Sequence, residues 1–284
     1  MRMNLTMLNR AAVLLVRNPR LLLTKALVKL RASRAVPASP CRRTIHGVLF
    51  EFDFDLDPAV RQMYLGSYQV EVVNLMRKFI TRGSAFLDVG ANIGYLSALG
   101  MGLVGTTGEV HSFEPVPEYC SRLRTLASSN PAYRLTVNQF ALGVEHTTAQ
   151  VSTSRLPNIG WATMVPGLMD AQEIKYSVDT EVQRLDRYIE SHNLTNISLL
   201  KIDCEGYEFP VLKGLQGFFE TARVLPPVLC EVAPAAYPLS GESLSGLESY
   251  MNRYRYRAFS TIDCRTAVDI KKLEGTTDVV FLAR

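Results

Sequence analysis

The chain has 284 residues, of which 47% are hydrophobic and 20% charged, and its formal net charge is +4. This composition is ordinary for a globular protein and supplies enough apolar surface for a sizeable core. Residues 1–44 contain no Asp or Glu, so the basic excess lies there and the rest of the chain is mildly acidic, which argues against a nucleic-acid-binding face on the main domain. The five cysteines are widely spaced without a C-x-x-C pair, which indicates reduced thiols and excludes a disulfide framework or a cysteine-based zinc site.

Residues 1–43 are predicted to form a basic amphipathic N-terminal leader and linker. Its first apolar run is too short to span a membrane, and Arg17 and Lys25 interrupt the pattern expected of a signal peptide. Residues 21–30 have an apolar face flanked by lysines, which is typical of an amphipathic helix. Such a helix either packs on protein or lies on an anionic membrane surface. We therefore expect a cytoplasmic protein, with peripheral membrane contact as an open alternative.

Residues 44–284 are predicted to form one α/β domain. A strand is expected over 45–54, and Asp57-Pro58 has the chemistry of a helix start. From residue 85 strands and helices alternate, except that residues 143–184 form an inserted, lid-like segment with strands over 147–153 and 178–184. The other predicted strands are 85–89, 109–113, 135–140, 197–202, 228–232, 258–262 and 278–282. The helices are 93–103, 118–128, 186–192, 209–219 and 244–254.

This alternation predicts a mostly parallel, Rossmann-like sheet with helices on both faces. Ligands of such sheets bind at the carboxyl ends of the strands. Acids stand at four of those ends, namely Asp88, Glu114, Asp203 and Glu231. We therefore expect these acids to converge on one edge of the sheet.

The turn after the first of these strands predicts the cofactor. It has Gly90 and Gly94 without the G-x-G-x-x-G of dinucleotide folds, and the preceding Asp88 would repel a pyrophosphate. The same acid suits a cofactor with an amino group and a cationic centre, and Asn92 can cap the helix or bind the ligand. Glu114 is placed to accept hydrogen bonds from both ribose hydroxyls. The pattern favours S-adenosylmethionine, with an NAD-linked oxidoreductase as the alternative.

Several spaced motifs resemble one family, the FkbM-type S-adenosylmethionine-dependent methyltransferases, over residues 45–283. They are Tyr64–Tyr68, Phe86–Gly94, Phe113–Pro117, Ala141–Gly143, Leu199–Glu208, Val211–Gly214 and Cys230–Val232. The resemblance implies a seven-stranded sheet with an antiparallel last strand, and O-methylation of a hydroxyl on a sugar, glycan or natural-product acceptor. It also implies that Asp88, Gly90, Asn92 and Gly94 line the methionine and adenosine part of the cofactor. Glu114 would hold the ribose, and Asp203, Glu205 and Glu208 would lie beside the reacting methyl group.

An alcohol acceptor must lose its proton during methyl transfer, which requires a general base. Asp203 and Glu205 are the candidates, because they stand at a rigid strand end. With Glu208 or Glu231 they could instead hold a divalent metal, but no His joins the cluster and we expect no metal. Stabilisation of a helix N-terminus is the structural alternative for Glu205 and Glu208.

Three aromatic residues and one acid are predicted to contact the acceptor. They are Tyr68, Trp161, Tyr207 and Glu208, and for the aromatic residues packing in a core is the alternative. The predicted partner is a small-molecule or glycan acceptor. A catalytically idle cofactor-binding protein, tethered to a membrane or partner by its leader, is a further alternative function.

Overall fold

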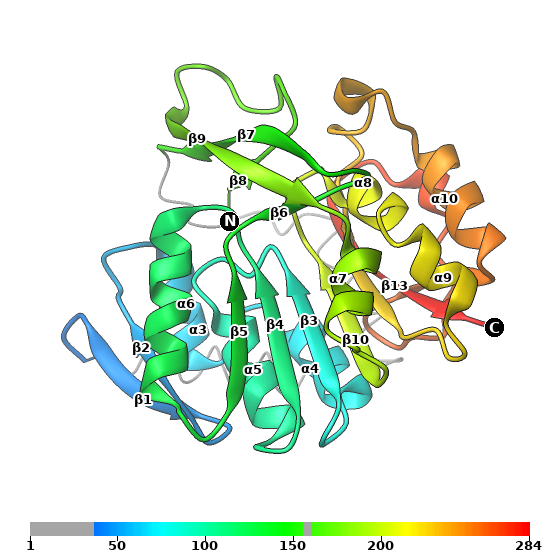
Figure 1. Cartoon of the computed structure of the whole chain (residues 1–284). Helices are drawn as coiled ribbons and strands as arrows, with labels where there is room; N and C mark the ends of the chain where they lie inside the picture. Colours follow the sequence, from blue (N-terminus) through cyan, green and yellow to red (C-terminus); the bar gives the residue numbers. More distant parts are fainter. Residues whose placement is uncertain (1–36, 156–160) are drawn as a thin grey trace, which may run out of the picture.

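The computed structural model describes residues 37–155 and 161–284, which form an α/β fold around a seven-stranded sheet (Figure 1). The strand order is β12-β13-β11-β10-β3-β4-β5. β13 is antiparallel to both of its neighbours and the other pairs are parallel, which confirms the predicted mostly parallel sheet with an antiparallel last strand. The strands are β3 (Ala85–Val89), β4 (Glu109–Phe113), β5 (Arg134–Asn138), β10 (Ile197–Ile202), β11 (Val228–Val232), β12 (Tyr256–Ser260) and β13 (Thr277–Ala283).

Alternation along the central strands builds one core on each face of the sheet. Leu87 and Leu200 face the core under α7 (Leu185–Ser191), α8 (Glu208–Lys213), α9 (Gln216–Thr221) and α10 (Leu244–Arg253). Phe86 and Leu199 face the opposite core, under α3 (Pro58–Leu65), α4 (Val70–Phe79), α5 (Tyr95–Val104) and α6 (Pro117–Ser129). Both faces are covered, as near-continuous apolar strands require.

The predicted strand over 45–54 is confirmed for residues 48–52, but the segment also contains the turn of a hairpin. β1 (Cys41–Ile45) pairs antiparallel with β2 (Val48–Phe52) across a two-residue turn. His46 and Gly47 both have positive φ angles, 49° and 88°, as a type I′ hairpin turn requires. Residues 41–43, assigned to the linker from sequence, are therefore part of a strand. The predicted amphipathic helix over 21–30 lies outside the described residues.

The helices follow the prediction closely, with one exception. Asp57 caps α3 by accepting a hydrogen bond from the Ala59 N–H, and Pro58 follows it as expected. The predicted helix over 209–219 is wrong, since α8 and α9 are separate helices on either side of Gly214. A Cβ atom on Gly214 would lie 2.1 Å from the carbonyl oxygen of Gly143, so the chain bends where another backbone segment approaches.

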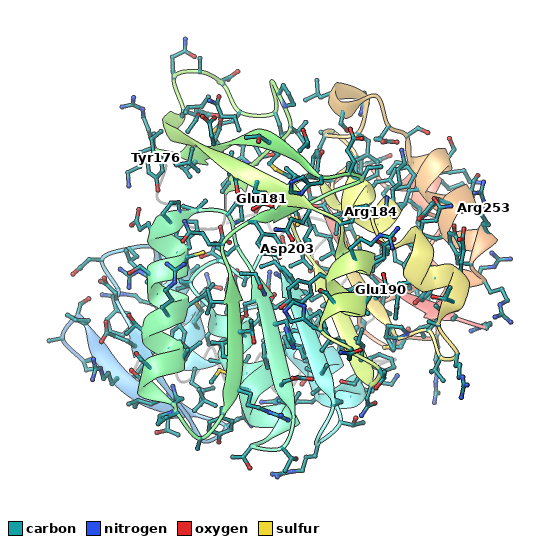
Figure 2. The ribbon with its side chains drawn as sticks, in the orientation of Figure 1. Tyr176, Glu181, Arg184, Glu190, Asp203 and Arg253 are labelled. Atoms are coloured by element: carbon teal, nitrogen blue, oxygen red, sulfur yellow. The ribbon has the colours of Figure 1, made fainter. Side chains whose placement is uncertain are left out.

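Residues 141–155 and 161–183 contribute the strands of a second sheet over the carboxyl ends of β3, β4 and β5 (Figure 1). This small sheet has the order β6-β9-β7-β8 and contains β6 (Ala141–Leu142), β7 (Thr147–Ser154), β8 (Ala162–Thr163) and β9 (Ile174–Gln183). Tyr176 of β9, labelled in Figure 2, donates a hydrogen bond to Glu118 of α6 at 3.3 Å, which connects the small sheet to the main body. Among the helices of the described ranges, none combines the length and the apolar character that a membrane span needs.

Candidate functional site

Two adjoining cavities lie at the carboxyl ends of the parallel strands. The first cavity, of about 530 Å³, lies against the small sheet and is lined by Phe113, Glu114, Tyr119, Phe140, Leu142 and Met164, among others. The second cavity, of about 740 Å³, lies against α3, the start of α4 and α5 and is lined by Met63, Tyr68, Gln69, Tyr95, Lys201 and Glu231, among others. Gly90, Asn92, Asp203 and Glu205 line both cavities.

The turn after β3, residues 90–94, forms the boundary between the two cavities, and its glycines have different roles. Gly90 has a φ angle of 74°, and a Cβ atom there would lie 1.8 Å from the carbonyl oxygen of Asp203, so only glycine fits. Gly94 begins α5 with a φ angle of 86°, and its Cβ would lie 2.7 Å from Leu123 of α6. Gly94 therefore allows the turn to pack on α6 and lines neither cavity.

Glu114 follows β4 and lines the first cavity, and each of its carboxylate oxygens accepts one backbone N–H. Its Oε2 accepts from the Asn92 N–H at 2.8 Å, and its Oε1 accepts from the Val116 N–H at 2.9 Å. Burial raises the pKa of Glu114 to about 7, although the two N–H groups act in the opposite direction. The predicted acid therefore lies at the predicted cavity, joined directly to the turn that carries Asn92.

Asp88 lies beneath this turn and lines neither cavity. It is completely buried, accepts a hydrogen bond from Ser97 Oγ at 2.6 Å, and is ion-paired with Lys201 Nζ at 3.3 Å. Asp88 thus supports the turn from below. Its position does not allow the direct contact with a cofactor that the sequence predicted.

Lys201, which sequence reasoning overlooked, is a buried cation in β10. Burial lowers the pKa of Lys201, but the carboxylates of Asp203 and Asp88 outweigh burial and raise it overall. The sequence does contain a signal for it, because Lys201 stands among aliphatic residues in a strand predicted to be buried on both faces. A charged residue at such a place is rarely found without a partner of opposite charge.

Three carboxylates, the acid cluster of Asp203, Glu205 and Glu231, meet beside Lys201. One oxygen of each lies within 4.8 Å of the others, so they could share one cation. Burial, and then repulsion from Asp203, raises the pKa of Glu205 to about 8 and that of Glu231 to about 10. Glu231 Oε2 is buried and finds no hydrogen-bond partner in the described part of the chain. Figure 2 shows Asp203 at the end of the main sheet, below the small sheet.

The predicted acceptor-binding residues are dispersed. Tyr68 lines the second cavity, and burial raises the pKa of its hydroxyl. Glu208 lines neither cavity, because it is fully buried and its Oε1 accepts from the N–H groups of Cys204 and Gly206 at 3.0 and 2.8 Å. This position fits the structural alternative for Glu208, stabilisation of the turn before α8.

Tyr207 and Trp161 also lie outside the linings of the two cavities. The Tyr207 ring packs beside Gly143, whose Cβ would lie 3.4 Å from Tyr207 Cε1. Trp161 is half-buried next to Ala162, which does line the first cavity, and its carbonyl accepts from the Ser154 N–H at 3.1 Å. The structure therefore brings only Tyr68 of these four residues to a cavity wall.

Comparison with known proteins gives a family and several solved structures that align over most of the chain. Solved structures include an FkbM methyltransferase from Methylobacillus flagellatus (15% identity, TM-score 0.41), whose alignment covers 93% of this chain and 60% of that one. Aeropyrum pernix fibrillarin with bound S-adenosyl-L-methionine (9%, 0.43) aligns over 88% of this chain and 85% of its own, and an rRNA methylase from Streptococcus thermophilus (10%, 0.41) over 75% and 93%. No curated protein matches the sequence. The model of the FkbM methyltransferase domain matches residues 88–258, which contain the turn, Glu114 and the acid cluster, and the chain therefore belongs to the FkbM methyltransferase family.

Proposed function

We propose that the protein methylates a hydroxyl group on a sugar, glycan or other natural-product acceptor. The FkbM methyltransferases to which it belongs use S-adenosylmethionine as the methyl donor. The observation that carries the proposal of O-methylation is the pair Asp203 and Glu205, two acidic residues that line both cavities at the end of β10. An oxygen acceptor needs a base at this place, and the site offers one.

The residues of the first cavity fit the nucleoside part of S-adenosylmethionine. The Glu114 carboxylate has acceptor capacity beyond its two backbone N–H partners for ribose hydroxyls. Phe113, Tyr119 and Met164 supply the apolar surface that an adenine ring requires. The same cavity disfavours the alternative of an NAD-linked oxidoreductase. The pyrophosphate of NAD would lie close to the acidic side chains of Glu114, Asp203 and Glu205.

The chain's own residues then have defined tasks. When bound, S-adenosylmethionine supplies a methyl group on a positively charged sulfur. Asp203 or Glu205 takes the proton of the acceptor hydroxyl as the oxygen–methyl bond forms and the carbon–sulfur bond breaks. The turn at Gly90 holds the donor against the end of β10, so that positioning contributes much of the acceleration. The small sheet covers the first cavity and restricts the access of water.

A screen with methyl-labelled S-adenosylmethionine tests this proposal. We expect label transfer to the hydroxyl of at least one sugar or natural-product acceptor, with and without a chelator, since the proposed base needs no metal. Calorimetry with S-adenosylhomocysteine runs in parallel. Binding of S-adenosylhomocysteine without transfer to any acceptor in a broad panel would favour the catalytically idle alternative, and loss of transfer on chelation would contradict the metal-free mechanism.

A further inference from the structure

A hydroxyl group of the small sheet contacts the loop that carries Glu205. Thr163 of β8 is only 3% exposed, and its Oγ1 donates a hydrogen bond to the Glu205 carbonyl at 2.8 Å. The same oxygen accepts a hydrogen bond from the Val165 N–H at 3.1 Å. The hydroxyl therefore acts as donor and acceptor at once, which fixes its orientation.

The backbone of Glu205 needs such support because its conformation is unfavourable. Its φ angle is 49°, in the left-handed region that residues other than glycine rarely adopt. Gly206 follows with a φ angle of 100°. Strained backbone of this kind persists where the surrounding contacts hold it, and it is found often at functional sites.

The Glu205 turn, residues 204–206, is held from two sides. On one side, Glu208 Oε1 accepts hydrogen bonds from two N–H groups of the turn, at 3.0 and 2.8 Å. On the other side, a Cβ atom on Gly206 would lie 3.2 Å from Leu168, so the segment after β8 packs against the turn. Thr163 supplies the hydrogen bond on this second side.

The segment that holds the Glu205 turn also covers the first cavity. Ala162 and Met164, the two neighbours of Thr163, line the first cavity, whereas Thr163 itself does not. Glu205 lines both cavities. One short segment of the small sheet therefore contacts the cavity assigned to the methyl donor and the loop of a candidate base.

We propose that Thr163 is a positioning residue, which holds the Glu205 turn in its left-handed conformation and thereby keeps the Glu205 side chain at the wall shared by the two cavities. Without the hydroxyl, the Glu205 backbone can relax to a negative φ angle, which turns the side chain away from this wall. The importance of this placement for methyl transfer rests on the proposed O-methyltransferase function. The hold itself does not, because it can be measured without donor or acceptor.

Amide hydrogen exchange of the protein without ligands, measured by NMR, tests the hold. Thr163→Val has nearly the same shape but no hydroxyl, so the Gly206 amide should exchange about 5–50-fold faster, the effect of removing one buried hydrogen bond. Thr163→Ser keeps the hydroxyl and should exchange nearly as slowly as the wild type. An unchanged rate at Gly206 in Thr163→Val would overturn the proposal.

Thr153→Val is the matched control. Thr153 of β7 lies in the same small sheet, is only 2% exposed, and donates to the Tyr176 carbonyl of β9 at 3.0 Å. Its hydrogen bond stays within the small sheet, so Thr153→Val should leave the exchange of Gly206 as in the wild type. Equal acceleration in Thr153→Val and Thr163→Val would contradict the proposal, because any loss of stability would then loosen the turn. Thr163→Ala also removes the hydroxyl and serves for the same measurement if Thr163→Val does not fold.

Methyl transfer to an acceptor from the screen tests the consequence of the hold. Thr163→Val should lower kcat by about 10–100-fold, as expected when a reacting group is misplaced. Its affinity for S-adenosylhomocysteine should change by only a few-fold, because Ala162 and Met164 still line the first cavity. Thr163→Ser should recover most of kcat. Equal losses in kcat and affinity, shared by Thr163→Ser, would mean that Thr163 only maintains the shape of the small sheet.

The positioning role and the proposed function can fail separately. If the exchange of Gly206 responds as expected but wild-type protein methylates no acceptor, the proposed function fails while the hold by Thr163 stands. If wild-type protein is active and Thr163→Val keeps its full kcat, the positioning role fails while the proposed function stands.

Discussion

The turn after β3 and the acid cluster at the ends of β10 and β11 share one edge of the sheet, yet they differ in how their polar groups are satisfied. At the turn, each carboxylate oxygen of Glu114 accepts a backbone N–H, and Gly90 fits against β10 with no space for a Cβ. In the acid cluster, three carboxyl groups lie within 4.8 Å of one another, and Glu231 Oε2 is left without a partner among the residues described. Both carboxylate oxygens of Glu114 therefore have partners without a ligand, whereas one carboxylate oxygen of the acid cluster does not.

The difference indicates where binding and chemistry are divided. A set of donors and acceptors that is already satisfied holds its shape before the ligand arrives, which lowers the cost of binding. Buried acids that repel one another reduce stability, and such groups persist where function needs them. We therefore assign recognition of the nucleoside to the turn and proton transfer to the acid cluster.

The largest expected effect comes from the acid cluster. Asp203→Asn keeps the size of the side chain but cannot accept a proton, so methyl transfer should fall by about 10²–10⁴-fold. Affinity for S-adenosylhomocysteine, measured by calorimetry, should change by only a few-fold, because the turn is untouched. Asp179→Asn, on the exposed side of β9, is the control for loss of one acidic charge and should behave as wild type. Equal losses in rate and affinity would contradict the assignment of binding to the turn and of proton transfer to the acid cluster.

The next effect concerns the turn. At pH 8, above the pKa of about 7, Glu114→Gln replaces a charged acceptor of two N–H groups by an amide with one acceptor oxygen. Hydrogen bonds to charged groups contribute about 1.5–3 kcal/mol, so affinity for S-adenosylmethionine should fall by roughly 10–100-fold. The rate at saturating donor should fall much less. An unchanged dissociation constant in calorimetry would contradict the role of Glu114.

A smaller effect appears in stability as a function of pH. Burial raises the pKa of Glu231 to about 10 and that of Glu205 to about 8, above the values of an unfolded chain. The folded state therefore binds the extra protons, and their stabilising contribution is complete below about pH 4.5 and is lost as the pH rises towards 8–10. Glu231→Gln should flatten this decline between pH 5 and pH 9 in thermal unfolding of the ligand-free protein. Glu190→Gln, on the surface of α7 (Figure 2), should leave the slope unchanged, and an equally steep decline in Glu231→Gln would count against the repulsion.

The sequence predicted the convergence of the strand ends well, because parallel strands with apolar runs have few alternatives. Glu114, Asp203 and Glu205 could be placed at the edge from their positions after predicted strands. The turn at Gly90 was also predictable, since two glycines between a strand and a helix limit the geometry.

The features that could not be predicted from the sequence depend on contacts that no local pattern reports. The break between α8 and α9 arises from the approach of the Gly143 backbone to Gly214, which no local propensity reports. Asp88 reads as a ligand-facing acid, but its position within β3 directs it to the buried Lys201. Glu208 belongs to the same sequence motif as Glu205, yet its carboxylate accepts hydrogen bonds from the N–H groups of Cys204 and Gly206 in the preceding loop.

The smallest expected effect separates two tyrosines that the sequence could not distinguish. Tyr68 lines the second cavity and packs edge-to-face on Tyr95, with ring centroids 5.8 Å apart, so Tyr68→Phe keeps the packing and removes only the hydroxyl. Burial raises the pKa of that hydroxyl, which makes it a neutral hydrogen-bond donor at all working pH values. A neutral hydrogen bond contributes about 0.5–1.5 kcal/mol, so KM for the acceptor should rise roughly 3–10-fold while S-adenosylhomocysteine binds as before. Tyr207→Phe, outside the linings of both cavities, is the matched control. If Tyr207→Phe raised the acceptor KM and Tyr68→Phe did not, the acceptor would lie on the side of the small sheet, and the second cavity would lose its role.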